Sequence, residues 1–208
     1  MSIVTVSRQY GSGGSEVAAL VAGSLGWTLL DNALVDEVAA RMRMTPQAVE
    51  AIEERVPSLA ERLADTFALG APELAPVYPA EAVPSMERRL LNVTRRVIDD
   101  AVARGNVVIV GRGAQSSLAQ RSDALHVFCC APREVLVARA AKRLGVTEAE
   151  AARTVDDTNR QREQYVRRHW NRSWAAPEHY HVCVNTGALG VEGAARLVTA
   201  LARERFGG

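Results

Sequence analysis

Residues 3–15 read Ile3-Val4-Thr5-Val6-Ser7-Arg8-Gln9-Tyr10-Gly11-Ser12-Gly13-Gly14-Ser15. The β-branched run at the start favours a buried strand, and the glycines favour a turn. Residues 16–25 then carry apolar side chains at helical spacing. A strand, a glycine-rich turn and a helix in this order are typical of a phosphate-binding loop. The stretch therefore predicts an α/β fold with an anion site at its first turn.

The glycine loop departs at two positions from the usual phosphate-binding pattern, G-x-x-x-x-G-K-[ST]. Arg8 stands where that pattern has its first glycine, and Gly14 stands where it has lysine. Gly13 and Ser15 agree with the pattern. The positive charge of the loop must therefore come from another position. Arg8 folded over the loop, or an arginine of a lid, are the two candidates.

Glycines allow backbone amides to converge on an anion, because side chains are absent and positive φ is accessible at low cost. The amides expected to do so are those of Gly11, Ser12, Gly13 and Gly14. The following helix adds its dipole, and the hydroxyl of Ser15 could ligate a Mg²⁺ ion that bridges two phosphates. A plain glycine turn is the alternative, and the flanking strand and helix favour the phosphate site.

Composition limits the class of protein. The chain has 208 residues, 48% of them hydrophobic, which suits one α/β domain with an inserted or mobile part. A formal net charge of +1 argues against nucleic-acid binding. Cys129, Cys130 and Cys183 lie in apolar runs and are expected to be reduced core thiols. No leader or membrane-spanning window is found, so the sequence predicts a cytoplasmic protein without a membrane partner.

Short apolar runs alternate with helical patterns along the chain. This alternation predicts a three-layer α/β fold with a mostly parallel sheet. The expected strands are residues 2–6, 27–30, 106–110, 125–130 and 181–184. The expected helices are residues 16–25, 32–43, one from 46 onward, 85–104, 132–144, 147–168 and 190–206. Residues 69–84 are proline-rich and are the best candidate for a mobile connection.

Polar groups follow two of the expected strands directly. Asp31 follows the second strand, and Gly111-Arg112-Gly113 follows the third. The carboxyl ends of strands face the ligand crevice of an open α/β sheet, so both could contact an acceptor phosphate or hydroxyl. The alternatives are a helix N-cap for Asp31 and a surface turn for Arg112. Flanking glycines and a guanidinium suited to phosphate favour the ligand interpretation for Arg112.

The expected helix at residues 147–168 carries many charges, and most of them are interpreted as a solvated face. Asp157 and Arg160 are exceptions, because the helix leads into an aromatic and arginine-rich stretch at residues 165–174. A flap that carries arginines can neutralise charge during phosphoryl transfer. The histidines in this region lack metal-ligand spacing.

In chain order, these features resemble the cytidylate kinase-like family, within the nucleoside monophosphate kinases. The matching stretches are residues 7–14 (SRQYGSGG), 30–31 (LD), 108–114 (VIVGRGA), 128–132 (FCCAP), 157–160 (DTNR) and 184–186 (VNT). Each stretch is weak evidence alone, but together they cover almost the whole chain.

The resemblance implies a P-loop kinase fold with strand order 2-3-1-4-5, made of a core (residues 1–30, 85–145 and 178–208), an NMP-binding segment (about 31–84) and a lid (about 146–177). It implies transfer of the ATP γ-phosphoryl group to a nucleoside monophosphate, CMP or dCMP in particular, with Mg²⁺. Residues 11–15 would bind the ATP phosphates, and Ser15 would ligate the metal. The remaining implied roles are acceptor binding by Asp31 and Arg112, lid function for Arg153, Asp157 and Arg160, and proximity to adenine for Asn185 and Thr186.

Two departures from the family pattern leave alternatives open. Gly14 replaces the lysine that follows the phosphates into the transition state. Residues 56–86 lack the expected base-reading pattern. Beside a kinase of nucleoside monophosphates, the sequence therefore permits a nucleotide-binding module with weak catalysis, or a kinase of a non-nucleotide small molecule.

Overall fold

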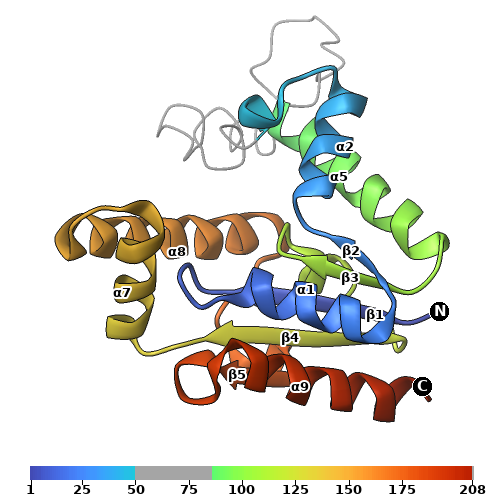
Figure 1. Ribbon diagram of the computed structural model, residues 1–208. Coiled ribbons are helices and arrows are strands. Elements are labelled where there is room, and N and C mark those ends of the chain that lie inside the picture. Colours follow the sequence, from blue (N-terminus) through green and yellow to red (C-terminus); the bar gives the residue numbers. More distant parts are fainter. Residues whose placement is uncertain (50–85, 208) are drawn as a thin grey trace, which may run out of the picture.

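The computed structural model describes residues 1–49 and 86–207 of the chain. In these residues, five strands form a parallel sheet in the order β2-β3-β1-β4-β5, which confirms the predicted fold class (Figure 1). The strands are β1 (Ile3–Arg8), β2 (Thr28–Leu30), β3 (Val107–Val110), β4 (Ala124–Cys130) and β5 (Val182–Asn185).

Helices lie on both faces of the sheet and beyond its carboxyl edge. They are α1 (Gly14–Leu25), α2 (Asn32–Met42), α5 (Met86–Ala103), the short α6 (Ala114–Ser117), α7 (Arg133–Leu144), α8 (Glu148–Trp170), the 3₁₀ turn η1 (Pro177–His179) and α9 (Thr186–Phe206). Figure 1 shows α7 and α8 side by side next to the loop that follows β1. The short α6 is an element that the sequence did not predict.

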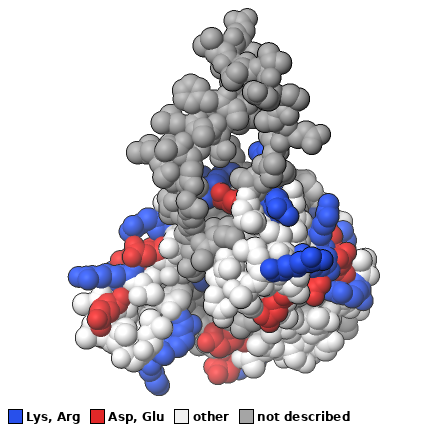
Figure 2. Space-filling model, turned by 90° about the horizontal axis from the view of Figure 1, so that it is seen from above, with Lys and Arg blue, Asp and Glu red and all other residues white. Residues whose placement is uncertain are grey.

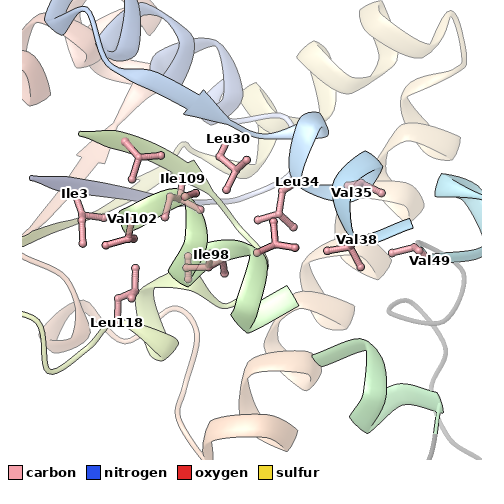
Figure 3. Close-up of a cluster of buried hydrophobic side chains, with 14 of the residues drawn as sticks. Ile3, Leu30, Leu34, Val35, Val38, Val49, Ile98, Val102, Ile109 and Leu118 are labelled. Atoms are coloured by element: carbon pink, nitrogen blue, oxygen red, sulfur yellow. The ribbon is translucent and has the colours of Figure 1, made fainter. Parts of the chain in front are cut away.

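Alternate residues of the central strands pack into different hydrophobic layers. Val4 and Val6 of β1 point toward α1 and α9. Ile3 and Ile109 point toward α2 and α5, in the cluster drawn in Figure 3. All four side chains are fully buried. A strand covered on both faces is expected to read as a continuous apolar run, as the sequence of β1 does.

Most ends of the predicted helices agree with the structure within one residue, but α1 begins two residues earlier, α8 ends two residues later, and α9 starts earlier than predicted. Thr147 and Glu150 form a capping box at the start of α8. The predicted closing helix began at Gly190, but α9 begins at Thr186, with Asn185 as its cap. Gly190 has φ 70° and ψ 169°, so it kinks the helix at the residue where the sequence placed its start.

Several predictions fall on residues 50–85, outside the described residues. They are most of the helix from residue 46, the proline-rich stretch at 69–84 and the greater part of the predicted NMP-binding segment. The division into core, NMP-binding segment and lid stays a prediction. No helix of the described residues is long and apolar enough to span a membrane.

The cysteines lie in the strands, as predicted, but only Cys129 is buried. Cys130, the last residue of β4, is half-buried, and Cys183 in the edge strand β5 is exposed. All three are free thiols. Burial raises the pKa of the Cys129 thiol to about 12, so this group is a poor nucleophile.

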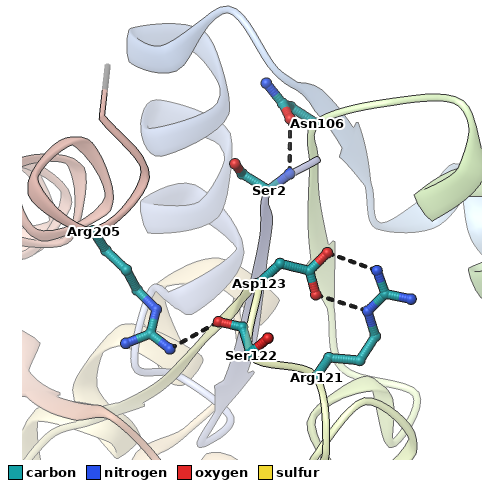
Figure 4. Close-up of polar contacts among 6 residues, drawn as sticks. All are labelled: Ser2, Asn106, Arg121, Ser122, Asp123 and Arg205. Carbon is teal, nitrogen blue, oxygen red and sulfur yellow. Dashed lines mark hydrogen bonds and ion pairs between the residues drawn. The ribbon is translucent and has the colours of Figure 1, made fainter.

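Polar contacts fix the amino-terminal edge of the sheet, opposite to the glycine loop (Figure 4). The side-chain oxygen of Asn106 accepts a hydrogen bond from the amide of Ser2, at 2.8 Å. Arg121 forms an ion pair with Asp123 at 2.6 Å. On the face seen in Figure 2, acidic and basic side chains lie next to one another, in keeping with the small net charge.

A polar seam joins β1, β4 and the residue that precedes β5 within this apolar sheet. The Thr5 hydroxyl lies 2.7 Å from His126 Nδ1, and the His126 amide donates to His181 Nδ1 at 2.8 Å. The two imidazole rings stack with centroids 5.1 Å apart. Burial, together with the proximity of His181, lowers the pKa of His126 to about 4. The folded protein therefore keeps His126 neutral.

We expect this histidine to make the free energy of unfolding depend on pH. An unfolded histidine titrates near pH 6.5, so between about pH 6.5 and 4 the unfolded chain binds a proton that the folded chain does not. Stability should fall as the pH falls through this range, by up to about 1.4 kcal/mol for each pH unit. Urea unfolding between pH 7.5 and 4.5 measures this slope.

The His126→Gln variant should show a flatter slope than the wild type, whatever its absolute stability. His179→Gln is the matched control, because its ring lies outside the stacked pair. An unchanged slope in His126→Gln would show that other groups cause the acid sensitivity.

Candidate functional site

A cavity of about 240 Å³ opens where β1, β2 and β3 end. Strand ends and the turns after them supply its floor, α6 and α8 supply its walls, and the connection from α8 to β5 closes one side. Among the lining residues are Arg8, Asp31, Gly111, Arg112, Gln115, Gln161, Arg162, Tyr165, Trp174 and Tyr180. The carboxyl edge of an open parallel sheet is the place where such folds bind ligands.

The glycine loop lies beside this cavity and requires its glycines. Gly11 and Gly13 have φ values of 81° and 73°, in the left-handed region that glycine adopts most easily. A Cβ on Gly11 would overlap the carbonyl oxygen of Leu136, and one on Gly13 would lie 2.7 Å from Val191. Side chains at these positions are thus excluded by both conformation and contact.

Ser12 holds the loop in shape. Its side chain is fully buried, its hydroxyl donates to the Gln9 carbonyl at 2.8 Å, and its amide donates to the same oxygen at 3.2 Å. The Ser12 amide, predicted as a phosphate donor, is therefore bonded within the loop in this structure. Ser15 lies in the first turn of α1 and is half-buried.

Arg8 reaches from the end of β1 toward the end of β3, on the cavity side. One guanidinium nitrogen occupies the space that a Cβ on Gly111 would take, and Cζ lies 3.1 Å from that position. The other nitrogen lies 3.8 Å from Asp31. Burial lowers the pKa of Arg8, and nearby Arg112 lowers it further, whereas Asp31 opposes the shift. The Arg8 charge thus faces the cavity.

Asp31 does not serve as the helix cap that was the alternative to a ligand role. It precedes α2, but its side chain makes no capping hydrogen bond. Its carboxylate instead faces Arg8 and lines the cavity. The structure therefore brings Asp31, Arg8 and Arg112 together, as expected if they share a ligand.

Arg162 of α8 completes a cluster of three arginines around the cavity. Its Nη1 donates to the Arg8 carbonyl at 2.6 Å. Burial, and then the charges of Arg8 and Arg112, lower the pKa of Arg162 to about 9. Arg112 has φ 53°, an uncommon value for a residue other than glycine. Three guanidinium groups beside one carboxylate favour the binding of an anion.

Helix α8, within the predicted lid, contacts the glycine loop directly. Asn159 accepts a hydrogen bond from the Tyr10 amide at 2.8 Å, one turn before Arg162. Arg143 of α7 lies over the Tyr10 ring at 4.5 Å. At the end of α8, Trp170 covers Gly113 so closely that no Cβ would fit there. The helix is thus held at the loop and at the end of β3.

The structure does not bring the predicted lid residues into the cavity. Asp157 and Arg160 form an ion pair with each other at 3.3 Å, and their side chains are 61% and 65% exposed. Arg153 is also exposed. Their roles stay predictions. The sequence did hold a signal for the inward face, because buried Ala151, Val155 and Val166 lie in phase with Asn159 and Arg162, which the prediction missed.

Thr186 supports the loop from the other side, and Asn185 before it caps α9. Asn185 caps α9 by accepting hydrogen bonds from two amides, the nearer at 2.9 Å. The Thr186 hydroxyl is buried and donates to the Ser12 carbonyl at 2.6 Å. Arg139, also missed, bonds both the Ser12 carbonyl and Thr186. Thr186 and Arg139 thus bind the loop, and the proximity of Asn185 and Thr186 to adenine stays a prediction.

The donor groups near the loop fit a Mg²⁺ ion that arrives with phosphates. Ser15 offers a hydroxyl and Asp31 a carboxylate, and Mg²⁺ is commonly held by one or two carboxylates, waters and substrate phosphates. Within residues 1–49 and 86–207, no group of three His, Cys, Asp or Glu side chains could hold a metal ion.

Comparison with known proteins shows which proteins this chain is similar to. A model of the cytidylate kinase-like family matches residues 3–188. No curated protein sequence matches the chain significantly. Among solved structures, an uncharacterized protein from Eubacterium ventriosum is similar at 19% identity and TM-score 0.70, covering 97% of this chain and 98% of that one.

Two shikimate kinases are also similar in structure. The enzyme from Bacteroides thetaiotaomicron has 13% identity and TM-score 0.53, covering 96% of this chain and 97% of its own. The enzyme from Acinetobacter baumannii, solved with shikimate, has 14% identity and TM-score 0.52, covering 99% of this chain and 95% of its own. At these identities the likeness shows a shared fold.

The arginine cluster predicts different effects for two arginines on α8. Arg162→Ala removes a charge and the bond to the Arg8 carbonyl, and should weaken the binding of inorganic phosphate about tenfold or more. Arg160→Ala, the matched control, removes an exposed arginine and should change phosphate affinity less than about twofold. Isothermal titration measures both. Equal losses of phosphate affinity in the two variants would mean that α8 turns Arg160 inward when the ligand binds.

Proposed function

This chain belongs to the cytidylate kinase-like family, and we propose that it transfers the γ-phosphoryl group of ATP to a nucleoside monophosphate, with CMP and dCMP as the first acceptors to test. The observation that carries the proposal is the arginine cluster beside the glycine loop, at the carboxyl ends of β1, β2 and β3. Such a cavity can hold two phosphate groups close to each other.

In this mechanism the loop amides around Gly11, Gly13 and Gly14 hold the ATP phosphates, with the positive end of the α1 dipole behind them. Arg112 and Arg162 hold the acceptor phosphate. The guanidinium of Arg8, beside Gly111 and Asp31, would bind the same acceptor phosphate from the end of β1. When bound, Mg²⁺ would supply further charge neutralisation, with Ser15 and Asp31 as its protein partners.

The chemical step needs no proton transfer when the acceptor is a phosphate. An oxygen of the acceptor phosphate forms a bond to the γ-phosphorus, the bond from that phosphorus to the bridging β–γ oxygen breaks, and its electron pair leaves with ADP. The contribution of the protein is positioning and charge. Helix α8 beside the loop also limits the access of water to the transferred group.

The remaining predicted residues belong to the proposal in supporting roles. Arg153, Asp157 and Arg160 lie on the outer face of α8 and would contribute through movement of the lid. Asn185 and Thr186 would border the adenine, while Thr186 braces the loop and Asn185 caps α9.

One observation favours a second acceptor class. Asp31 places a carboxylate in the cavity, where it could accept a proton from an alcohol, and a phosphate acceptor has no need of such a base. A kinase of a small acid that bears a hydroxyl group is therefore the second candidate. A nucleotide-binding module that lacks efficient catalysis is the third, since Gly14 replaces the usual lysine.

A coupled assay of ADP release separates these functions. We expect ADP release with ATP and Mg²⁺ to depend on an added nucleoside monophosphate, and to be greatest with CMP or dCMP across the ribo- and deoxyribonucleoside series. The Asp31→Asn variant should then lower kcat through the lost Mg²⁺ partner but keep measurable ADP release, because no base is needed.

Two results would redirect the proposal. ADP release only with hydroxy acids, abolished in Asp31→Asn, would indicate the small-molecule kinase. Binding of ATP without ADP release for any acceptor would indicate the module.

A further inference from the structure

The two departures of the glycine loop from the usual pattern lie against each other in space. A Cβ on Gly14 would overlap the Cβ of Arg8, lie 2.9 Å from its Cγ and 3.2 Å from the Cβ of Cys129. Gly14 is the first residue of α1 and is buried. Unlike Gly11 and Gly13, it does not have a positive φ, so its backbone would accept any side chain. A side chain at position 14 is excluded instead by the Cβ and Cγ of Arg8 and by the Cβ of Cys129.

This contact makes the usual lysine and Arg8 mutually exclusive. A lysine at position 14 needs the space that the first two carbons of the Arg8 side chain fill, and a glycine at position 8 would vacate most of it. Lys142, the sole lysine of the chain, is exposed on α7. Arg139 lies at the loop but donates to the Ser12 carbonyl and to Thr186, so the cation that the loop strand itself directs to the cavity is Arg8 of β1.

The guanidinium of Arg8 does not lie over the glycine loop but beside the end of β3. It fills the space beside Gly111, faces Asp31 at 3.8 Å, and lines the cavity together with Arg112. Gly111 has φ 69° and carries no side chain, which leaves room for the guanidinium. Arg162 holds the Arg8 carbonyl at 2.6 Å. These contacts direct the charge to the acceptor side.

We propose that Arg8 and Gly14 are one coupled exchange, which moves the cation of the phosphate-binding loop from α1 to β1, where it binds the anionic group of the acceptor. The inference rests on the proposed function only in naming the bound molecule an acceptor. The steric coupling and the anion binding by Arg8 hold for any anion in the cavity. A guanidinium suits this position, because its planar set of donors can bind two oxygens of a phosphate or carboxylate together.

A cycle of four chains tests the steric part: wild type, Arg8→Gly, Gly14→Ala and the double variant. Gly14→Ala should lower Tm by more than about 4 °C when Arg8 is present, since overpacking a tight contact costs stability. In the Arg8→Gly background the same change should shift Tm by less than about 1 °C. Equal shifts in both backgrounds would overturn the coupling.

Binding measurements test where the charge acts, with Arg8→Met as the variant that keeps the stem and loses the guanidinium. Phosphate affinity is measured on protein saturated with ADP and Mg²⁺, so that inorganic phosphate reports the remaining anion site. We expect Arg8→Met to weaken this phosphate about tenfold or more and to change ATP affinity less than about threefold. The reverse pattern, with ATP weakened and phosphate unaffected, would overturn the proposal.

The double variant Arg8→Gly, Gly14→Lys returns the cation to its usual position. It should bind ATP more tightly than Arg8→Gly alone without recovering phosphate affinity. Full recovery of phosphate affinity would show that either position can serve the acceptor, against the proposal. The melting and binding measurements do not depend on turnover. If the wild type releases no ADP, the proposed function is wrong, but these measurements still decide whether Arg8 and Gly14 are coupled.

Discussion

The packing of the Arg8 side chain between two glycines is the constraint on which the site depends. β1 lies between β3 and β4, so its last residue projects into the centre of the carboxyl edge. Gly14 leaves room for the stem of Arg8, and Gly111 leaves room for its guanidinium. Asp31 and Arg112 then lie beside the same charge. A side chain at either glycine would displace the cation.

The surrounding helices hold the loop so that this arrangement is formed before any ligand binds. Asn159 and Arg162 bond the loop backbone from α8, and Arg139 and Thr186 bond it from α7 and α9. The position of α8 and the conformation of the loop are therefore coupled. Preorganised charges of this kind stabilise a reacting group without the cost of rearrangement.

The sequence predicted the fold well, because buried parallel strands, helix caps and glycine turns are encoded locally. It also predicted that Asp31 and Arg112 meet at the strand ends, which follows from the sheet. It missed Arg162 and Arg139, since their roles depend on which face of each helix turns inward and on contacts between distant segments. For the same reason it left open whether Arg8 folds over the loop or a lid arginine supplies the charge, whereas Gly111 and Asp31 provide a place for Arg8 beside the cavity.

The most direct test of the central claim is a structure of the protein determined with ADP, Mg²⁺ and inorganic phosphate. The account predicts a phosphate in the cavity at the end of β3, in contact with the guanidinium groups of Arg8, Arg112 and Arg162. Arg8 turned away from the cavity, with its guanidinium on the phosphates of ADP, would contradict it.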